Sequence, residues 1–285
     1  MPIKSIMQFQ TKVDIPRLPF DIGPCEPMLF LGSCFADSIG KRFQEERFPV
    51  TVNPYGVMYN PASVLHAVEH LVADGLNVTT AVLTLGTNHV YIEKATGIIV
   101  DNCQKRPQRL FEERDLTIDS CIDYLQQAVR LLQQAVPSIR VLFTVSPIRY
   151  AKYGFHESQL SKATLLLAVD RLVKCNEEER KNGLTDSILA YFPAYEILLD
   201  ELRDYRFYAT DMLHPSPQAV EYIWLQLVEA AFSQAAKHYL DEWKPLKEAL
   251  GHRPFHPESP EYQVFLRKTQ EKVAALSKKY PTFAG

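Results

Sequence analysis

The chain has 285 residues, a length that suits one enlarged α/β domain or two small domains. Hydrophobic residues make up 46% and charged residues 23%, which is an ordinary composition for a globular protein. The net charge of −3 argues against nucleic acid as a main partner, because nucleic-acid-binding domains usually carry a basic face. No apolar run approaches the roughly 18 residues of a membrane span, so the sequence predicts no membrane partner either.

The N-terminal residues and the cysteines indicate the compartment. Residues 1–8 contain no apolar run long enough for the core of a signal peptide, so we expect a cytoplasmic protein. A signal peptide removed before this sequence begins would leave the same pattern, and that alternative stays open. The five cysteines are irregularly spaced and include no Cys-x-x-Cys pair, which favours free thiols over a zinc site. No metal and no cofactor is predicted.

A strand, a tight turn and a helix near the N-terminus organise the rest of the chain. Residues 28–31 form an apolar run that predicts a buried strand ending at Gly32-Ser33, and residues 34–46 show helical spacing. In a parallel sheet this order puts Ser33 at the carboxyl edge, where α/β folds place their chemistry. The backbone N–H groups of the helix start would favour a negative charge developing at that point.

Strands and helices alternate along the remaining chain. The sequence predicts further strands at residues 48–52, 81–85, 140–145 and 188–192, and helices at about 61–71, 117–134, 159–174, 195–202 and 217–239. This alternation implies parallel βαβ units with right-handed crossovers. Polar residues that follow the strands should therefore meet at one edge of the sheet.

Two segments lie outside this alternation. Residues 89–102 predict a β-hairpin insertion, with its turn at Lys94-Ala95-Thr96-Gly97. Residues 241–285 contain a proline-rich loop and a final helix at about 261–279. We predict a main domain of residues 1–240 and a C-terminal helical extension of residues 241–285 that packs on it. An exposed apolar face on this extension would favour a homodimer.

A late segment supplies the base that a reactive serine would need. His214 would take the proton of Ser33 and return it to the leaving group, and Asp211 would hold the imidazole in the right tautomer. The plainer interpretations are that Ser33 only caps the following helix and that His214 is a surface-loop histidine.

The thiol of Cys34 is a second candidate nucleophile, if the helix start lowers its pKa. Neighbouring residues of a helix start point in different directions, so only one of Ser33 and Cys34 should face His214. We favour Ser33 and expect Cys34 to be a buried core thiol.

Gly32-Ser33-Cys34-Phe35-Ala36 reproduces the motif for which the GSCFA family is named, and the chain resembles that family over about residues 25–225. Other matching blocks include Asn53-Pro54-Tyr55-Gly56, Thr84-Leu85-Gly86-Thr87, Ser146-Pro147-Ile148-Arg149 and Asp211-Met212-Leu213-His214-Pro215. The family looks like a branch of the SGNH (GDSL-type) hydrolases. The resemblance implies a flavodoxin-like, three-layer α/β fold with a parallel central sheet, and a triad of Ser33, His214 and Asp211. It implies no substrate.

The same resemblance suggests an oxyanion hole. In SGNH enzymes a glycine and then an asparagine follow the nucleophile along the chain, and Gly56 and Asn88 match that order here. Together with the Ser33 N–H they would bind the oxyanion, and one such donor is commonly worth about 3 kcal/mol of barrier. Gly56 could instead be a turn glycine with positive φ. Asn60 and Asn102 are the alternative donors and predicted substrate contacts.

Arg149 follows the predicted strand at 140–145, where it could bind a carboxylate or phosphate of the substrate. The alternative is a structural ion pair with Glu196, Glu201 or Asp204. The aromatic string at residues 205–208 could line a sugar platform or pack in the core.

These observations predict an SGNH-type serine hydrolase that cleaves an ester through an acyl-enzyme. The partner would be a small-molecule or glycan ester, with a carbohydrate O-acetyl group suggested by analogy with relatives. An acyltransferase with the same triad is one alternative. A non-catalytic protein that binds a glycan or metabolite in the same cleft is the other.

Overall fold

The computed structural model describes residues 10–101, 103 and 106–283. Its central layer is a five-stranded sheet in the order β2-β1-β3-β7-β8, and every neighbouring pair of strands is parallel. The strands are β1 (Met28–Gly32), β2 (Val50–Val52), β3 (Thr80–Leu85), β7 (Arg140–Val145) and β8 (Ile188–Tyr191). This strand order is the flavodoxin-like one, so the predicted fold class is confirmed.

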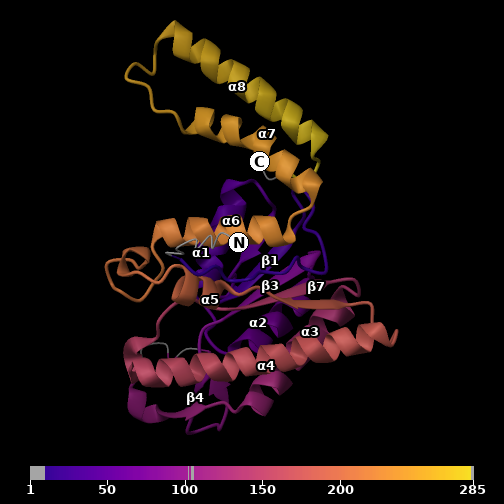
Figure 1. Cartoon of the computed structure of the whole chain (residues 1–285), viewed down its shortest axis with the longest axis vertical. Helices are drawn as coiled ribbons and strands as arrows, with labels where there is room; N and C mark the ends of the chain where they lie inside the picture. Colours follow the sequence, from indigo (N-terminus) through magenta and orange to yellow (C-terminus); the bar gives the residue numbers. More distant parts are fainter. Residues whose placement is uncertain (1–9, 102, 104–105, 284–285) are drawn as a thin grey trace, which may run out of the picture.

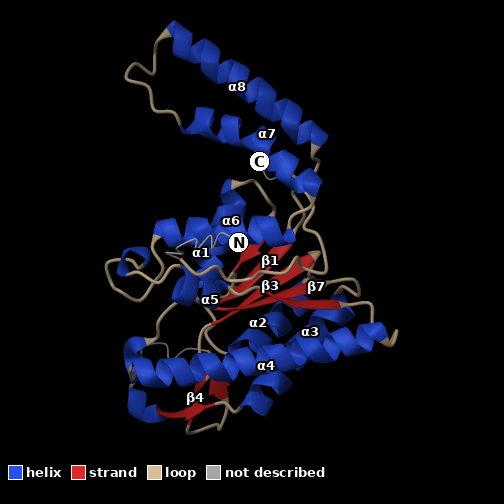
Figure 2. Ribbon diagram, in the orientation of Figure 1, coloured by secondary structure: helices blue, strands red, loops and turns tan. Residues whose placement is uncertain are grey.

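Helices cover both faces of the sheet and complete three layers (Figure 1, Figure 2). One face carries α1 (Cys34–Glu45), α5 (Ala194–Glu196) and α6 (Pro217–Ala231), and the other carries α2 (Pro61–Asp74), α3 (Ile118–Ala135) and α4 (Phe155–Lys181). Successive side chains of a strand point to opposite faces. Met28 and Phe30 of β1 therefore join the core under α1 and α6, whereas Leu29 and Leu31 join the core under α2, α3 and α4.

The turn between β1 and α1 is fixed by close backbone contact. Gly32 has φ +131°, and a Cβ atom there would lie 2.0 Å from the carbonyl oxygen of Thr84 on the neighbouring strand. Only glycine fits this position. The helix that follows buries Phe35, Ile39 and Phe43 against the sheet, as their spacing predicts.

The hairpin insertion is confirmed and gains a strand that the sequence did not reveal. β4 (His89–Glu93) pairs antiparallel with β5 (Ile99–Val100) as predicted, and on its other side with β6 (Phe111–Asp115). β6 consists of one buried phenylalanine followed by four exposed charged residues. Because this segment lacks alternating apolar residues, its sequence carries no strand signal.

The predicted helix at 217–239 is wrong in its extent, because two helices occupy this region. α6 ends at Ala231, and Ser233 starts α7 (Gln234–Gly251) by accepting the Ala236 N–H at 3.0 Å. Between them Phe232 is extended and buried in the core. Short helical turns complete the chain: η1 (Gln108–Leu110), η2 (Ala151–Tyr153), η3 (Ile197–Glu201) and η4 (Tyr205–Phe207).

The C-terminal helices α7 and α8 (Pro260–Lys279) form a hairpin beyond α6 (Figure 1). Two buried side chains of α7 attach it to the end of α1, since Tyr239 Oη donates to the Glu46 carbonyl at 2.6 Å and Trp243 Nε1 to the Glu45 carbonyl at 3.0 Å. Phe255 and Phe265 are exposed in this region. The homodimer stays a prediction. No helix among the described residues combines the length and the apolar character that crossing a membrane requires.

Candidate active site

Ser33 lies at the carboxyl end of β1, as predicted, but its side chain is fully engaged. Its Oγ accepts the Phe35 N–H at 3.3 Å as the cap of α1 and lies 3.2 Å from Thr84 Oγ1. Its backbone N–H donates to the Thr84 carbonyl at 3.0 Å. The residue is only 1% exposed. The predicted nucleophile therefore caps the helix in this structure, which is the plainer of the two roles that its sequence allowed.

Cys34 is the first residue of α1 and is half-buried, so the prediction of a buried core thiol is wrong. Its Sγ lies 3.6 Å from the hydroxyl of Tyr59. Burial, followed by this contact with the thiol, raises the pKa of the Tyr59 phenol above its usual value. The tyrosine therefore keeps its proton at neutral pH and is able to donate a hydrogen bond to the sulfur.

Asp211 and His214 form the pair that their spacing predicts. The imidazole Nδ1 lies 2.6 Å from Asp211 Oδ2, while Asp211 Oδ1 accepts the N–H groups of Leu213 at 2.9 Å and of His214 at 3.0 Å. These backbone hydrogen bonds, and then the imidazole, lower the pKa of Asp211 to about 2. An ionised carboxylate that accepts from Nδ1–H leaves Nε2 as the proton acceptor.

The loop that carries this pair is held by Arg149. The backbone N–H of Arg149 donates to the Leu213 carbonyl at 2.9 Å, and its Nη1 donates to the Met212 carbonyl at 3.1 Å. The guanidinium lies 4.0 Å from the ring centre of Phe155 and 5.4 Å from that of Tyr208.

The predicted alternative for Arg149, an ion pair with a nearby carboxylate, is wrong. The three candidate carboxylates bind other groups: Glu196 accepts from Tyr191, Glu201 from Tyr222, and Asp204 pairs with Arg206. Arg149 instead connects the end of β7 to the His214 loop.

Two predicted oxyanion donors are already bonded within the protein. The Ser33 N–H donates to the Thr84 carbonyl, as described above. The Gly56 N–H donates to the Asn53 carbonyl at 2.9 Å. Gly56 has φ +93° with open space around it, so it has the conformation of the turn glycine that its sequence allowed. Asn53 in turn fixes the turn after β1, because its Oδ1 accepts the Gly32 N–H at 2.9 Å.

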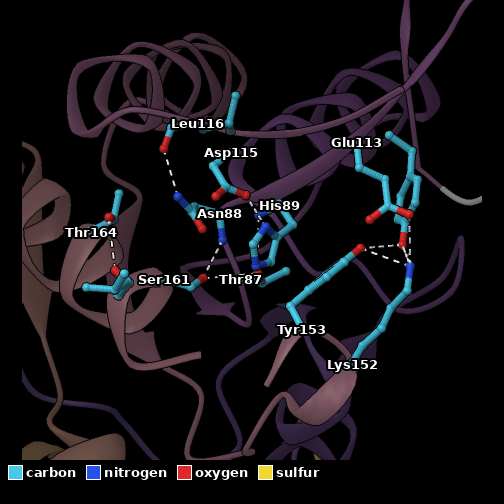
Figure 3. A network of polar contacts seen from close by, with 12 residues as sticks. Thr87, Asn88, His89, Glu113, Asp115, Leu116, Lys152, Tyr153, Ser161 and Thr164 are labelled. Carbon is cyan, nitrogen blue, oxygen red and sulfur yellow. Dashed lines mark hydrogen bonds and ion pairs between the residues drawn. The ribbon is translucent and has the colours of Figure 1, made fainter. Parts of the chain in front are cut away.

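Asn88, the predicted oxyanion asparagine, joins the two ends of the insertion to each other and to α4 (Figure 3). Its Nδ2 donates to the Leu116 carbonyl at 2.8 Å, and its backbone N–H donates to Ser161 Oγ at 2.9 Å. Ser161 Oγ also lies 3.0 Å from Thr87 Oγ1. These contacts give the Asn88 Nδ2 and N–H groups acceptors within the protein, whereas its buried Oδ1 has no hydrogen-bond partner among the described residues.

Asn60, an alternative donor, caps α2 by accepting the Ser63 N–H at 2.9 Å through Oδ1. Its Nδ2 has no acceptor in the part of the chain that the structure describes. Asn102, the other alternative, lies outside the described residues. The structure thus brings together Asp211, His214 and Arg149, and no hydrogen bond joins Ser33 to His214 within the described ranges.

Lys162 lies at the carboxyl edge of the sheet and is not among the site residues predicted from the sequence. It is buried, and its Nζ donates to the carbonyls of Gly86 at 2.6 Å and Ser146 at 2.9 Å, which joins the carboxyl ends of β3 and β7. Burial lowers its pKa to about 7. A signal was present, because Lys162 falls on the buried stripe of α4 with Leu165 and Val169.

A cavity of about 270 Å³ lies beside Arg149. It is lined by polar, aromatic and aliphatic side chains: Arg149, Gln159, Leu198, Leu199, Arg203, Asp204, Tyr205 and Tyr208. Tyr205 is 71% exposed, whereas Phe207 and Tyr208 pack against the core, so core packing accounts for part of the aromatic string and the sugar platform stays a prediction. Within the described residues, no group of three or more His, Cys, Asp or Glu side chains could hold a metal ion.

Among solved structures, a mutant acetyl esterase with a bound acetate ion is 11% identical with a TM-score of 0.44, and the match covers 78% of this chain and 99% of that one. A member of the lipolytic G-D-S-L family from Veillonella parvula is 12% identical with a TM-score of 0.44, covering 71% and 96%. A carbohydrate esterase family 3 protein from Talaromyces cellulolyticus is 10% identical with a TM-score of 0.41, covering 76% and 99%.

No curated protein matches the chain. The model of the "GSCFA domain protein, C-terminal domain" matches residues 243–284. The model of the GSCFA family matches residues 27–77 and 76–227, which together are most of the sequence. The chain belongs to the GSCFA family.

Proposed function

We propose that this protein hydrolyses an ester by transferring the acyl group to a side chain at the start of α1. His214 is the general base and Asp211 orients it. The observation that carries the proposal is the 2.6 Å contact between His214 Nδ1 and an Asp211 carboxylate whose pKa is about 2. A carboxylate that stays ionised at neutral pH stabilises the imidazolium formed when the base takes a proton.

The His214 loop also has a fixed place relative to the sheet. Arg149 follows β7 and binds two carbonyls of the loop, those of Met212 and Leu213. Because the carboxyl ends of parallel strands share one edge, this anchor supports a common location for the base and for the β1–α1 turn. The positive end of the α1 dipole favours the oxyanion of an acyl-transfer reaction at the same turn.

The reaction consists of two acyl transfers. The nucleophile gives its proton to His214 Nε2 and attacks the carbonyl carbon, and the leaving alcohol takes that proton as the ester bond breaks. Water then gives a proton to His214 and attacks the acyl-enzyme, which releases the acid and restores the nucleophile. The sequence favours Ser33 as the nucleophile, with Cys34 as the alternative.

A small-molecule or glycan ester is the substrate class that we propose. The cavity beside Arg149 combines the exposed ring of Tyr205 with the polar side chains of Arg203 and Gln159. A pocket with an apolar surface and a few hydrogen-bonding groups suits the alcohol part of such an ester.

Turnover of p-nitrophenyl acetate tests the proposal. His214→Ala should lower the rate by about 10³-fold or more. His238→Ala is the matched control, because His238 on α7 is 65% exposed and its only ion-pair partner among the described residues is Glu242; its rate should equal that of the wild type. A folded wild type without turnover, or equal rates in both variants, contradicts the proposal. Adding an acceptor alcohol separates the acyltransferase alternative, in which the ester of that alcohol would replace the free acid as product.

A further inference from the structure

We infer that the nucleophile of the proposed reaction is Sγ of Cys34 and that Ser33 supports it as the cap of α1. This inference rests on the proposed function, because it assigns the residue that accepts the acyl group. The two residues are adjacent, but the structure gives them different surroundings.

Ser33 is poorly placed to meet a substrate. At 1% exposure, its side chain offers almost no surface for an ester carbonyl to approach. Its Oγ already accepts the Phe35 N–H and contacts Thr84 Oγ1, so an attack would require the hydroxyl to abandon the helix cap.

Cys34 is the next residue and is half-buried, so its sulfur lies at the boundary between the core and solvent. Within the described residues its Sγ has one polar contact, the Tyr59 hydroxyl at 3.6 Å. The backbone of Tyr59 is fixed, because its carbonyl accepts the N–H groups of Gly86 and Thr87, both at 2.9 Å. The hydroxyl, which stays protonated, can donate to a thiolate at this position.

The backbone N–H of Cys34 supplies a second and independent observation. The Ser33 N–H donates to the Thr84 carbonyl, and the Gly56 N–H donates to Asn53. The Cys34 N–H has no acceptor within the described part of the chain, as is usual for the first N–H of a helix. An oxyanion formed on a carbon bonded to Cys34 Sγ would lie near this unused donor at the positive end of α1.

The reaction needs no reactant other than the ester and water. The thiol proton passes to His214 Nε2, the S–C bond forms, and the carbonyl π electrons move to the oxygen beside the Cys34 N–H. Collapse of this intermediate breaks the C–O bond, and the alkoxide takes the proton from His214 and leaves a thioester on Cys34. Water then adds with His214 as base, and the S–C bond breaks to give the acid and the thiol.

The test is to locate the acyl group. The wild type is mixed with p-nitrophenyl acetate, quenched in acid and mapped by peptide mass spectrometry, and the adduct is treated with neutral hydroxylamine, which cleaves a thioester but leaves an ester of serine intact. Turnover is measured for Cys34→Ala, Ser33→Ala and Ser33→Gly. Glycine is included because it is tolerated as a helix cap. Cys175→Ala on α4 is the control for an exposed thiol.

The expected result is a hydroxylamine-sensitive acetyl group on Cys34, with turnover lowered by about 10³-fold or more in Cys34→Ala. At least one folded Ser33 variant should keep its rate within about 10-fold of the wild type, and Cys175→Ala should match the wild type. A stable acetyl group on Ser33, with turnover retained in Cys34→Ala, would overturn the inference and leave the proposed hydrolase intact. A wild type with neither turnover nor adduct would instead refute the proposed function.

Discussion

Arg149 Nη1 donates to the carbonyl oxygen of Met212 at 3.1 Å, and this hydrogen bond connects the loop of the proposed base to the segment that follows β7. The guanidinium stays in place because it stacks on Phe155 and Tyr208. The sequence predicts that Arg149 binds the substrate. Because Arg149 holds the loop in the structure, we propose that it also positions the Asp211–His214 pair.

We predict that Arg149→Met lowers ester turnover by about 10²-fold, since a small displacement of a catalytic group has effects of that size. The backbone bond to Leu213 remains in this variant, so the fold should be retained. Arg203→Met is the matched control, because Arg203 lines the same cavity and has no hydrogen bond to the loop among the described contacts. Equal losses in both variants would show that Arg149 acts only on the substrate.

The titration of Asp211 gives a second prediction. Its folded pKa of about 2 lies below the unfolded value of about 3.9, so the carboxylate's contribution to stability is fully present above pH 4 and is lost as the pH falls towards 2. Carbon NMR of the Asp211 carboxyl group should give a midpoint near 2. A midpoint near 3.9 would mean that the hydrogen bonds from Leu213 and His214 do not persist in solution.

The low pKa of buried Lys162 predicts that stability also changes with pH in the neutral to alkaline range. Its folded pKa of about 7 lies below the unfolded value of about 10.4, so the unfolded chain binds more protons between these values and stability rises with pH there. The limiting slope is roughly 1.4 kcal/mol per pH unit. Urea denaturation from pH 7 to 9 should show this increase in the wild type and a smaller one in Lys162→Met. Lys174→Met, at an exposed position of the same helix, should keep the wild-type slope.

The turn before the proposed nucleophile supplies a fourth prediction. Gly32→Ala should destabilise the protein by about 3 kcal/mol or more, because its Cβ would meet the Thr84 carbonyl at 2.0 Å. Gly97 also has a positive φ, of +71°, but open space around it, so Gly97→Ala should cost only about 1 kcal/mol. Denaturation in urea compares the two variants. Similar losses would show that backbone strain, and not the contact with Thr84, limits the turn.

Much of the fold was predictable because buried parallel strands consist of continuous apolar runs. The largely apolar run from Arg140 to Val145 predicted a strand with the observed bounds of β7. The alternation of strands and helices predicted the parallel sheet. The strand Phe111–Asp115 carries almost no apolar residues, and its pairing with β4 depends on tertiary contacts. The break before α7 depends on a single capping residue, Ser233, within a helical pattern.

The parts of the site that depend on residues close together in the sequence were predictable. The parts that depend on contacts between residues far apart in the sequence were not. Asp211 and His214 are three residues apart, and their hydrogen bond follows from that local spacing. By contrast, Asn88 forms hydrogen bonds with Leu116 and Ser161, and no local pattern in the sequence predicts these contacts. The burial of Ser33 beside Thr84 likewise depends on the register between β1 and β3.

The proposed role of the Asp211–His214 pair is tested by following acylation of the whole protein with and without its proposed base. Wild type and His214→Ala are mixed with p-nitrophenyl acetate and quenched in acid within the first turnovers. The mass of each intact protein is then measured by mass spectrometry. We expect one acyl group on the wild type and none on His214→Ala, with a matching loss of released p-nitrophenol. Equal acylation and release by the two folded proteins would contradict the proposed mechanism, because the Asp211–His214 pair would then have no part in the reaction.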